Sequence, residues 1–263
     1  MKILEGIHIL IKEGKDMATN QATIEKMQNL KLFGMIRAFH TTMESGVKNN
    51  FTADELLGHL VDAEWDERHN RRLEKLIKDA KFRYQASIEQ IDFNLKRNLD
   101  KNIMLRFMDC DWINKKQNVI ITGPTGVGKS FVLCALGHQA CIYGFNTLYF
   151  NCTKLFSSLK LFKADGSYLK ELKRIAKQDL LILDDFGLEH LDKDTRLSLL
   201  EIFEDRHGIK STIITSQLPP AKWHEIIGDD TIADAICDRI IHSSFKIELK
   251  GESVRKIYKK PVN

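Results

Sequence analysis

The sequence predicts an α/β protein whose parallel sheet is preceded by a smaller all-α domain. Three observations lead to this prediction: helical periodicity up to residue 98, five short apolar runs after it, and helical segments between those runs. Apolar runs without polar alternation are typical of strands buried on both faces of a parallel sheet. With 263 residues, the chain is long enough for about two domains and a sizeable core. We place the boundary so that 17–98 and 99–263 form the two domains.

The N-terminal domain shows helical periodicity over about 19–98. Apolar residues recur there at three- and four-residue spacing, which predicts one long helix over 53–81. Residues 1–16 precede this domain, and we expect them to be a translated leader or a disordered tail. Lys12-Glu13-Gly14 can be encoded by a purine-rich stretch like a bacterial ribosome-binding site, which favours Met17 as the natural start.

The predicted long helix separates its charges along its length. Residues 54–67 carry six acids and no Lys or Arg, whereas 68–83 carry seven bases and two acids. Acids early and bases late suit the helix dipole, so a solvated helix face is one interpretation. The bases also fall at i+3 and i+4 steps, forming a stripe that could follow a DNA backbone or contact a partner. The residues of this stripe are Arg68, Arg71, Arg72, Lys75 and Lys78.

Five apolar runs after residue 98 are the expected strands. Helical segments separate them, as the crossover connections of a parallel sheet require. The runs are VIIT (119–122), TLYF (147–150), LLILDD (180–185), TIITS (212–216) and FKIEL (245–249).

The segment GPTGVGKSF follows the first expected strand and fits the phosphate-loop pattern G-x-x-x-x-G-K-[ST]. Its glycines let backbone N–H groups turn towards phosphate oxygens at the start of a helix, whose dipole favours anions. Lys129 is expected to reach the β- and γ-phosphates of ATP, and Ser130 to ligate Mg²⁺. A glycine-rich turn is the alternative. The expected nucleotide-binding residues are Gly123, Pro124, Thr125, Gly126, Val127, Gly128, Lys129, Ser130 and Phe131.

The third apolar run, LLILDD, ends in two carboxylates, as expected of a Walker B strand. Asp184 would hold Mg²⁺ through its water shell, and Asp185 would orient and polarise the attacking water. Many ATPases of this type have Glu at the second position. The shorter Asp185 therefore also fits a nucleotide-switched binding module that hardly hydrolyses ATP. An acid pair in a strand-end turn is a further alternative.

The composition excludes several classes of protein. The formal net charge of +4 is too small to prove a polyanionic partner, so the distribution of the charges matters more than their sum. No apolar run approaches the roughly 20 residues of a membrane span, and no membrane partner is expected. The five cysteines lie far apart without a CxxC pair, which is typical of reduced thiols in a cytoplasmic protein and offers no metal-ligand spacing.

Five motifs carry a family resemblance: GPTGVGKSF, LILDDFGLE, STIITSQLPPAKWHE, DAICDRIIHSS and ELKGESVRK. In this order and spacing they resemble the IstB-like ATP-binding proteins of insertion sequences, which are AAA+ ATPases related to DnaC-type helicase loaders and DnaA initiators. Upstream, LKLFGMIRAFHTTMESG and AEWDERHNRRLEKLIKDAKF resemble that family's helical N-terminal region. The resemblance covers nearly everything after about residue 25. It implies a three-layer AAA+ core with adjacent phosphate-loop and Walker B strands, and ATP bound between the subunits of a homo-oligomer.

The resemblance also assigns roles to single residues. STIITSQLP resembles the sensor-1 strand, so Gln217 is expected to contact the γ-phosphate or its water, with Ser216 as the second candidate. Arg239 resembles the box-VII arginine, an arginine finger that acts on the ATP of a neighbouring subunit. A surface salt bridge of Arg239 with Asp238 or Asp234 is the alternative. The expected catalytic residues are Lys129, Asp185, Gln217 and Arg239.

Three further expectations follow from the resemblance. Arg255 is a candidate sensor of the γ-phosphate in its own chain, and Asp92-Phe93 is expected near the adenine. In initiator-type AAA+ proteins an extra helical element in the region of 154–177 lines a channel that grips DNA. Contacts of this element with the DNA backbone would tolerate different sequences and be sensitive to salt. The alternative is that 154–177 is a helix pair exposed to solvent. The DNA-contacting residues expected in this element are Lys160, Lys163 and Lys170.

The sequence therefore predicts an ATP- and Mg²⁺-dependent transposition helper. It would assemble on double-stranded DNA, present that DNA to a partner transposase and hydrolyse ATP to reset the assembly. A replicative helicase loader with the same ATPase core is the alternative.

Overall fold

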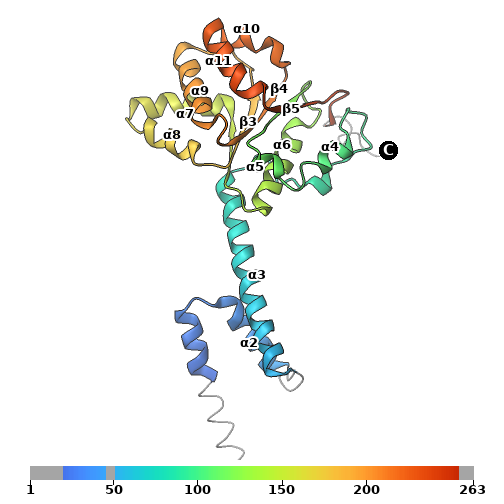
Figure 1. The fold of residues 1–263 in the computed structure, drawn as a ribbon, viewed down its shortest axis with the longest axis vertical. Helices are drawn as coiled ribbons and strands as arrows, with labels where there is room; N and C mark the ends of the chain where they lie inside the picture. The colour runs from blue at the N-terminus through green and yellow to red at the C-terminus, as the bar shows by residue number, and fades with distance from the viewer. Residues whose placement is uncertain (1–19, 46–50, 255–263) are drawn as a thin grey trace, which may run out of the picture. The chain divides into compact units, whose positions relative to one another are not determined.

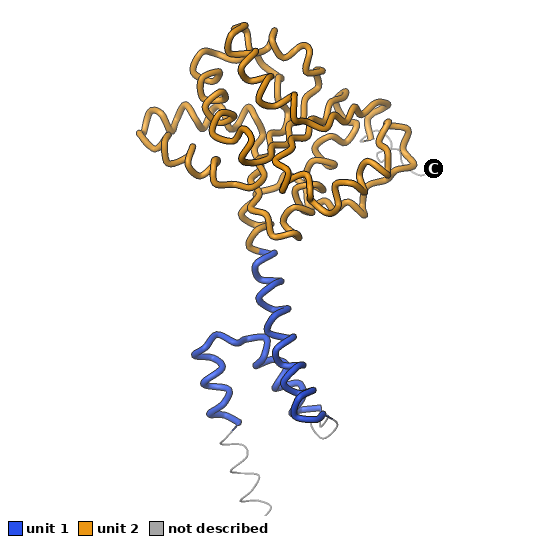
Figure 2. The backbone as a smooth tube through the Cα atoms, viewed as in Figure 1, with its two compact units in different colours: residues 1–74 blue, residues 75–263 orange. Residues whose placement is uncertain are grey.

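The computed structural model describes residues 20–45 and 51–254 of the chain. The chain divides into two compact units, Met1–Glu74 and Lys75–Asn263, which Figure 2 draws in different colours. The expected leader over 1–16 and the candidate sensor Arg255 lie outside the described residues.

The first unit is helical, as its periodicity predicts. It contains a helical segment over 20–29, α2 (Phe33–Glu44) and the first part of α3 (Ala53–Ala80). A capping box starts α3: the Thr52 hydroxyl accepts the N–H of Glu55, and the Glu55 carboxylate accepts the N–H of Thr52. The prediction of this long helix is confirmed to within one residue. The buried apolar residues of this first unit are Ile24, Ala38, Phe39 and Leu60.

One buried carboxylate joins α2 to α3. Oε2 of Glu64 accepts the N–H of Gly34 at 2.8 Å and that of Met35 at 3.3 Å, while its Oε1 accepts from Nε of Arg68 at 2.6 Å. Gly34 lies so close to α3 that a Cβ there would be 2.3 Å from the carbonyl oxygen of Ala63. The glycine thus lets the two helices approach, and Glu64 satisfies N–H groups that the start of α2 leaves without helical acceptors.

The second unit is built on a five-stranded sheet in the order β2-β3-β4-β1-β5, and each pair of neighbouring strands is parallel. Side chains of β1 alternate between two apolar clusters, with Val119 and Ile121 in one and Ile120 in the other. All five expected strands are confirmed, with ends shifted by one residue at most. They are β1 (Asn118–Thr122), β2 (Thr147–Asn151), β3 (Leu180–Phe186), β4 (Ser211–Ser216) and β5 (Ser244–Glu248).

Helices cover both faces of this sheet and complete a three-layer arrangement (Figure 1). One face carries η2 (Ile88–Gln90), α4 (Lys101–Leu105), α5 (Asp111–Asn114) and α6 (Lys129–Ile142). The other face carries α7 (Cys152–Ala164), α8 (Tyr168–Ala176), α9 (Lys193–Arg206), α10 (Trp223–Ile227) and α11 (Asp230–Ile241). A short 3-10 helix, η3 (Pro220–Lys222), leads into α10.

The expected adjacency of the phosphate-loop strand β1 and the Walker B strand β3 is wrong. β4 lies between them and pairs with both, so that Ile213 is opposite Val119 on one side and Ile182 on the other. Neighbours in a parallel sheet depend on where the crossover helices pass, not on the order of the strands along the chain. As a result, the carboxyl end of β4 brings Thr215 and Ser216 between the phosphate loop and the acid pair.

The division between the units also differs from the expected boundary after residue 98. Ala86, Ile88, Ile91 and Leu99 are buried in the same apolar cluster as β1 and α6, so this segment packs on the sheet. Helical periodicity continues through α3 across the division between Glu74 and Lys75, so no composition shift marks it.

Candidate nucleotide-binding site

The phosphate loop connects β1 to α6 and depends on its glycines. Gly126 and Gly128 have φ angles of 89° and 96°, in the left-handed region that other residues adopt only with strain. A Cβ on Gly128 would also lie 2.7 Å from Nη1 of the buried Arg97. Gly128 is the N-cap of the 14-residue α6. The loop therefore ends at a helix N-terminus, where backbone N–H groups and the helix dipole favour phosphate.

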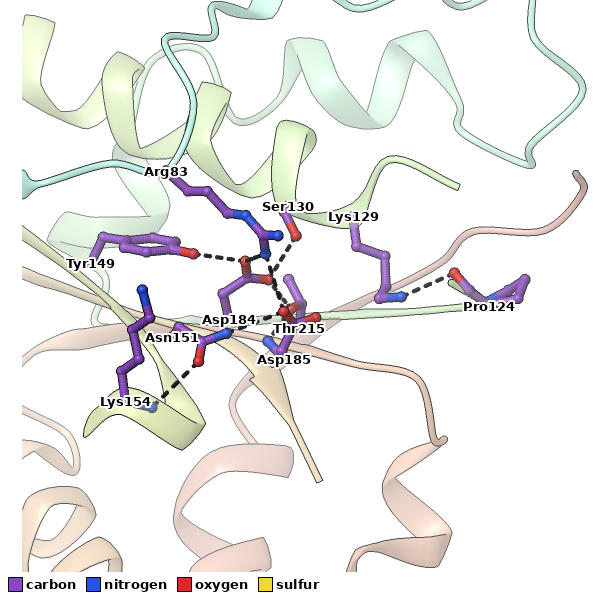
Figure 3. Close-up of polar contacts among 10 residues, drawn as sticks. All are labelled: Arg83, Pro124, Lys129, Ser130, Tyr149, Asn151, Lys154, Asp184, Asp185 and Thr215. Atoms are coloured by element: carbon purple, nitrogen blue, oxygen red, sulfur yellow. Dashed lines mark hydrogen bonds and ion pairs between the residues drawn. The ribbon is translucent and has the colours of Figure 1, made fainter. Parts of the chain in front are cut away.

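Lys129 is buried, and its amine lies within the loop. Nζ of Lys129 donates to the carbonyl oxygens of Gly123 at 2.8 Å and Pro124 at 3.0 Å. Figure 3 shows the side chain extended alongside the loop towards Pro124. The carbonyl groups of Gly123 and Pro124 thus hold the amine at the phosphate loop. Val127 of the same loop is fully buried and belongs to the core.

Asp184 is fully buried and accepts three hydroxyl hydrogens. Its Oδ1 accepts from Ser130 at 3.0 Å and from Thr215 at 2.5 Å, and its Oδ2 accepts from Tyr149 at 2.8 Å (Figure 3). Burial and the negative charge of Asp184 raise the pKa of Tyr149 far above its ordinary value, so the phenol stays a donor. The Ser130 hydroxyl and the Asp184 carboxylate are the hard oxygen ligands that Mg²⁺ prefers, and they fit the expected metal.

Asp185 lies at an irregular point of β3. Its φ angle is 62°, and the pairing register with β4 shifts between Leu183 and Phe186. The Asp185 N–H donates to Oγ1 of Thr215 at 2.9 Å, and its Oδ2 accepts from Nδ2 of Asn151 at 3.2 Å. A non-glycine residue in this conformation is uncommon and is often found at functional sites.

A basic side chain completes the group. Nη1 of Arg83 lies 3.2 Å from Oδ2 of Asp185 and 3.6 Å from Oδ2 of Asp184 (Figure 3). Partial burial acts to lower the Arg83 pKa, but the nearby Tyr84, Tyr149 and acid pair outweigh it and raise that pKa. Arg83 therefore carries its positive charge directly beside both Walker B acids.

Sequence reasoning missed four members of this group: Arg83, Tyr149, Asn151 and Thr215. Asn151 ends β2 and Thr215 lies at the end of β4, so both stand at the carboxyl edge of strands that flank β3. That position is where parallel sheets gather functional side chains, and it was a usable signal. No sequence signal marked Arg83, which arrives from the segment after α3.

The group borders a cleft of about 590 Å³, a volume within the range of small-molecule sites. Gln217 is exposed and lines the cleft, whereas the Ser216 hydroxyl is buried, donates to the Phe186 carbonyl and accepts the Leu218 N–H. The geometry thus favours Gln217 over Ser216 as the sensor. The other expected residues that line the cleft are Asp92, Thr125, Gly126, Gly128, Lys129, Ser130, Phe131 and Asp185. Phe93 packs against the apolar cluster instead.

Arg239 does not line this cleft. Its guanidinium pairs with Glu204 and donates to the carbonyl oxygen of Ala235 at 2.8 Å. Neither Asp234 nor Asp238, the partners considered from the sequence, is its ion-pair partner among the described residues. A role in another subunit's site stays a prediction.

The expected DNA-contacting residues differ in their surroundings. Lys160 pairs with Asp192, and Nζ of Lys163 lies 3.8 Å from Asp194, while Lys170 is exposed. In the long helix, Arg68 pairs with Glu64 and Arg71 with Glu67. Arg72 and Lys75 are exposed. The ion pairs supply a structural role for four of these residues, and DNA contact stays a prediction for all seven.

Two expectations from composition can be compared with the structure. All five cysteines are free and buried. Across the ranges 20–45 and 51–254, no helix combines the length and apolar character needed to cross a membrane.

Comparisons with known proteins identify the family of this chain. A family model described as IstB-like ATP binding protein matches residues 25–261. The chain is 44% identical over 234 residues to y4pL of Sinorhizobium fredii, named as an insertion sequence ATP-binding protein, and the match covers 89% of this chain and 96% of that protein. An ATP-binding protein of insertion sequence IS5376 from Geobacillus stearothermophilus is 29% identical, with 88% of this chain and 92% of that protein covered.

Solved structures show the same fold at low identity. DnaI has a TM-score of 0.54 at 22% identity, covering 67% of this chain and 93% of that chain. The DnaC helicase loader has a TM-score of 0.53 at 22% identity, covering 64% of this chain and 98% of that chain. The chain therefore shares the α/β fold of these AAA+ structural neighbours. The chain has the phosphate loop and the acid pair, and the family model matches most of its residues. The chain therefore belongs to the family of IstB-like ATP-binding proteins.

Proposed function

We propose that this protein is a transposition helper that binds and hydrolyses ATP, assembles on duplex DNA and delivers that DNA to a partner transposase. The observation that carries the proposal is the hydrogen bond of Ser130 to Asp184, with Lys129 and Asp185 beside it at the same cleft. Membership of a family of insertion sequence ATP-binding proteins supports the choice of process.

The chain's own residues divide the work at the cleft. N–H groups of the phosphate loop and the amine of Lys129 bind the phosphates. Ser130 and Asp184 would hold Mg²⁺, which supplies positive charge to the phosphate oxygens when bound. Asp185 orients the attacking water and accepts its proton, while Asn151 and Thr215 keep this carboxylate and its backbone in place. Gln217 reaches the cleft and contacts the γ-phosphate or the water.

Assembly and DNA binding belong to the same proposal. Arg239 lies away from the cleft of its own chain, which supports action on the nucleotide of a neighbouring subunit. The exposed bases Arg72, Lys75 and Lys170 are available for phosphate contacts. Such contacts make DNA binding sequence-tolerant and sensitive to salt.

One observation favours a second candidate, a nucleotide-operated switch that hardly hydrolyses ATP. Oδ2 of Asp185 accepts from Asn151 and lies 3.2 Å from Arg83, so the oxygen that would take a proton from water already has two partners. A switch would bind ATP and change its assembly without turnover.

Calorimetric titration with ATP and Mg²⁺, followed by an ATPase assay with and without duplex DNA, tests the proposal. We expect binding and DNA-stimulated turnover in the native chain, and loss of ATP binding in Lys129→Ala. The exposed Lys101 lies in the same unit, and Lys101→Ala serves as the matched control. Bound ATP without turnover would favour the switch, and absence of binding would overturn both candidates.

The partner is tested separately by co-purification. We expect the native chain with ATP and duplex DNA to retain a transposase as its partner. Retention of a hexameric replicative helicase instead would favour a helicase loader. The solved DnaC helicase loader has the same fold as this chain.

A further inference from the structure

Arg83 is held at the cleft by the packing of its neighbours. Gly137 of α6 has no side chain, and a Cβ there would lie 2.6 Å from Cε1 of Phe82. The Phe82 ring therefore packs directly against the helix that follows the phosphate loop. On the other side of Arg83, Tyr84 packs against the apolar cluster of the same face, and its ring centroid lies 5.4 Å from Cζ of Arg83. Two anchored aromatic residues thus fix the backbone on either side of the arginine.

The guanidinium of Arg83 shares one nitrogen between both Walker B acids. Nη1 lies 3.2 Å from Asp185 and 3.6 Å from Asp184, and the Arg83 side chain remains 40% exposed. Arg83, Lys129, Ser130 and Asp185 line the same cleft. A long, partly exposed side chain can change its rotamer without disturbing the core, so Arg83 can reach other anions in this cleft.

Bound Mg²⁺ and ATP would change the balance of charge around Arg83. Ser130 and Asp184 would hold the cation, whose positive charge would weaken the attraction of the Asp184 carboxylate for the Arg83 guanidinium. Lys129 and the phosphate loop, which would hold the phosphates, line the same cleft as Arg83. A γ-phosphate in this cleft would offer Arg83 a strong anion, and arginine binds phosphate with paired, charge-assisted hydrogen bonds.

We propose that Arg83 contacts the γ-phosphate of ATP in its own chain, leaving the acid pair when Mg²⁺ and ATP bind. The contact lets the site distinguish ATP from ADP, because ADP offers no γ-phosphate to replace the acids. Departure of Arg83 also removes one of the two partners of the Asp185 oxygen and leaves it available to the water. This inference rests on the proposed nucleotide site and adds a specificity-determining residue to it.

Calorimetric affinities for ATP and for ADP, each with Mg²⁺, test the role of Arg83. In Arg83→Ala we expect the affinity for ATP to fall by about 10- to 100-fold, the value of one or two charge-assisted hydrogen bonds. The affinity for ADP should change by less than about threefold, so the preference for ATP collapses. Arg83→Lys keeps the charge but loses the paired hydrogen-bond geometry. Its affinity for ATP should therefore lie between those of the native chain and Arg83→Ala.

Arg106 provides the matched control, because it is an exposed arginine of the same unit that does not line the cleft. Arg106→Ala should bind both nucleotides as the native chain does. Equal losses of affinity for ATP and ADP in Arg83→Ala would show that Arg83 only holds the acid pair. Unchanged affinities for both nucleotides would show that Arg83 does not contribute to nucleotide binding. Either result overturns the inference while the nucleotide site stands. Failure of the native chain to bind either nucleotide would overturn the proposed function as well.

Circular dichroism of each variant establishes that it is folded before the titration. Should Arg83→Ala not fold, Arg83→Lys and Arg83→Gln carry the same comparison. A selective loss for ATP in those variants supports the contact, and equal losses contradict it.

Discussion

Thr215 donates its hydroxyl hydrogen to Oδ1 of Asp184 at 2.5 Å and accepts the backbone N–H of Asp185 at 2.9 Å. One side chain on β4 thus binds both Walker B acids on β3. This is possible because β4 lies between β1 and β3 and ends where the two acids begin. Thr215 therefore couples the position of the expected metal ligand to that of the expected base.

Thr215→Val keeps the shape of the side chain and removes its hydroxyl. Asp184 then loses one hydrogen bond, and the N–H of Asp185 loses its acceptor. We expect the free energy of unfolding to fall by about 1–3 kcal/mol, measured by urea unfolding, and the Mg²⁺-dependent affinity for ATP to weaken. Thr215→Ser retains the hydroxyl and is the control. Equal behaviour of the two variants would show that the hydrogen bonds contribute little.

Asp185→Asn tests the assignment of the base. The amide keeps the size of the carboxylate but cannot take a proton from water, so hydrolysis should fall by about 100- to 10,000-fold. ATP binding should persist, because removing a negative charge beside the phosphates does not oppose it. Single-turnover hydrolysis and calorimetry measure the two effects. Glu189→Gln changes an exposed acid near the same strand and is the control. Hydrolysis at the native rate in Asp185→Asn would contradict the assignment.

Glu64→Ala tests the junction between α2 and α3. The buried carboxylate accepts the N–H groups of Gly34 and Met35, and the loss should destabilise this unit by about 1–3 kcal/mol. Amide hydrogen exchange at Gly34 and Met35 should become faster by the corresponding factor. Glu74→Ala removes an exposed carboxylate from the same helix and should leave these exchange rates unchanged.

The ionisation of Glu64 adds a pH dependence to this junction. Burial acts to raise its pKa, but hydrogen bonds from Arg68, Met35 and Gly34 and the charge of Arg68 outweigh burial and lower that pKa. A lowered pKa in the folded state means that the carboxylate stabilises the unit above its ordinary pKa. That stabilisation is lost as the pH falls below about 4.3 towards the folded value. Protection of the α2 amides that is insensitive to acid would contradict this account.

The buried thiols predict a dependence at alkaline pH. Burial raises the pKa of Cys134 to about 11 and that of Cys110 to about 12. A raised pKa in the folded state means that the neutral thiols stabilise the fold fully below about pH 8.5 and progressively less as the pH rises to the folded values. Urea unfolding at increasing pH should show this fall, and Cys134→Ala should show a smaller one. A slope that is the same in both proteins would refute the contribution of Cys134.

Local sequence patterns determined most of the elements and part of the site. The apolar runs of β1 to β4 became strands whose side chains are mostly buried, as expected of a parallel sheet covered on both faces, whereas the edge strand β5 buries only Ile247. The glycines and Lys129 are adjacent in the chain, so their spacing alone predicts the phosphate loop. Ser130 and Asp184 were identified by their places after a strand and at the end of one, and the structure brings them within 3.0 Å.

Tertiary structure alone decided the strand order, the extent of the units and the surroundings of the acid pair. β4 separates β1 from β3, and α3 continues across the boundary between the units without any change of pattern. Arg83 is 102 residues from Asp185 along the chain and lies 3.2 Å from it in space. Local periodicity depends on residues close together in the sequence. Long-range contacts depend instead on where the crossover helices and the packed aromatic residues place the backbone. The sequence by itself therefore determined that a nucleotide site exists, and only the packing of the chain determined which side chains surround it.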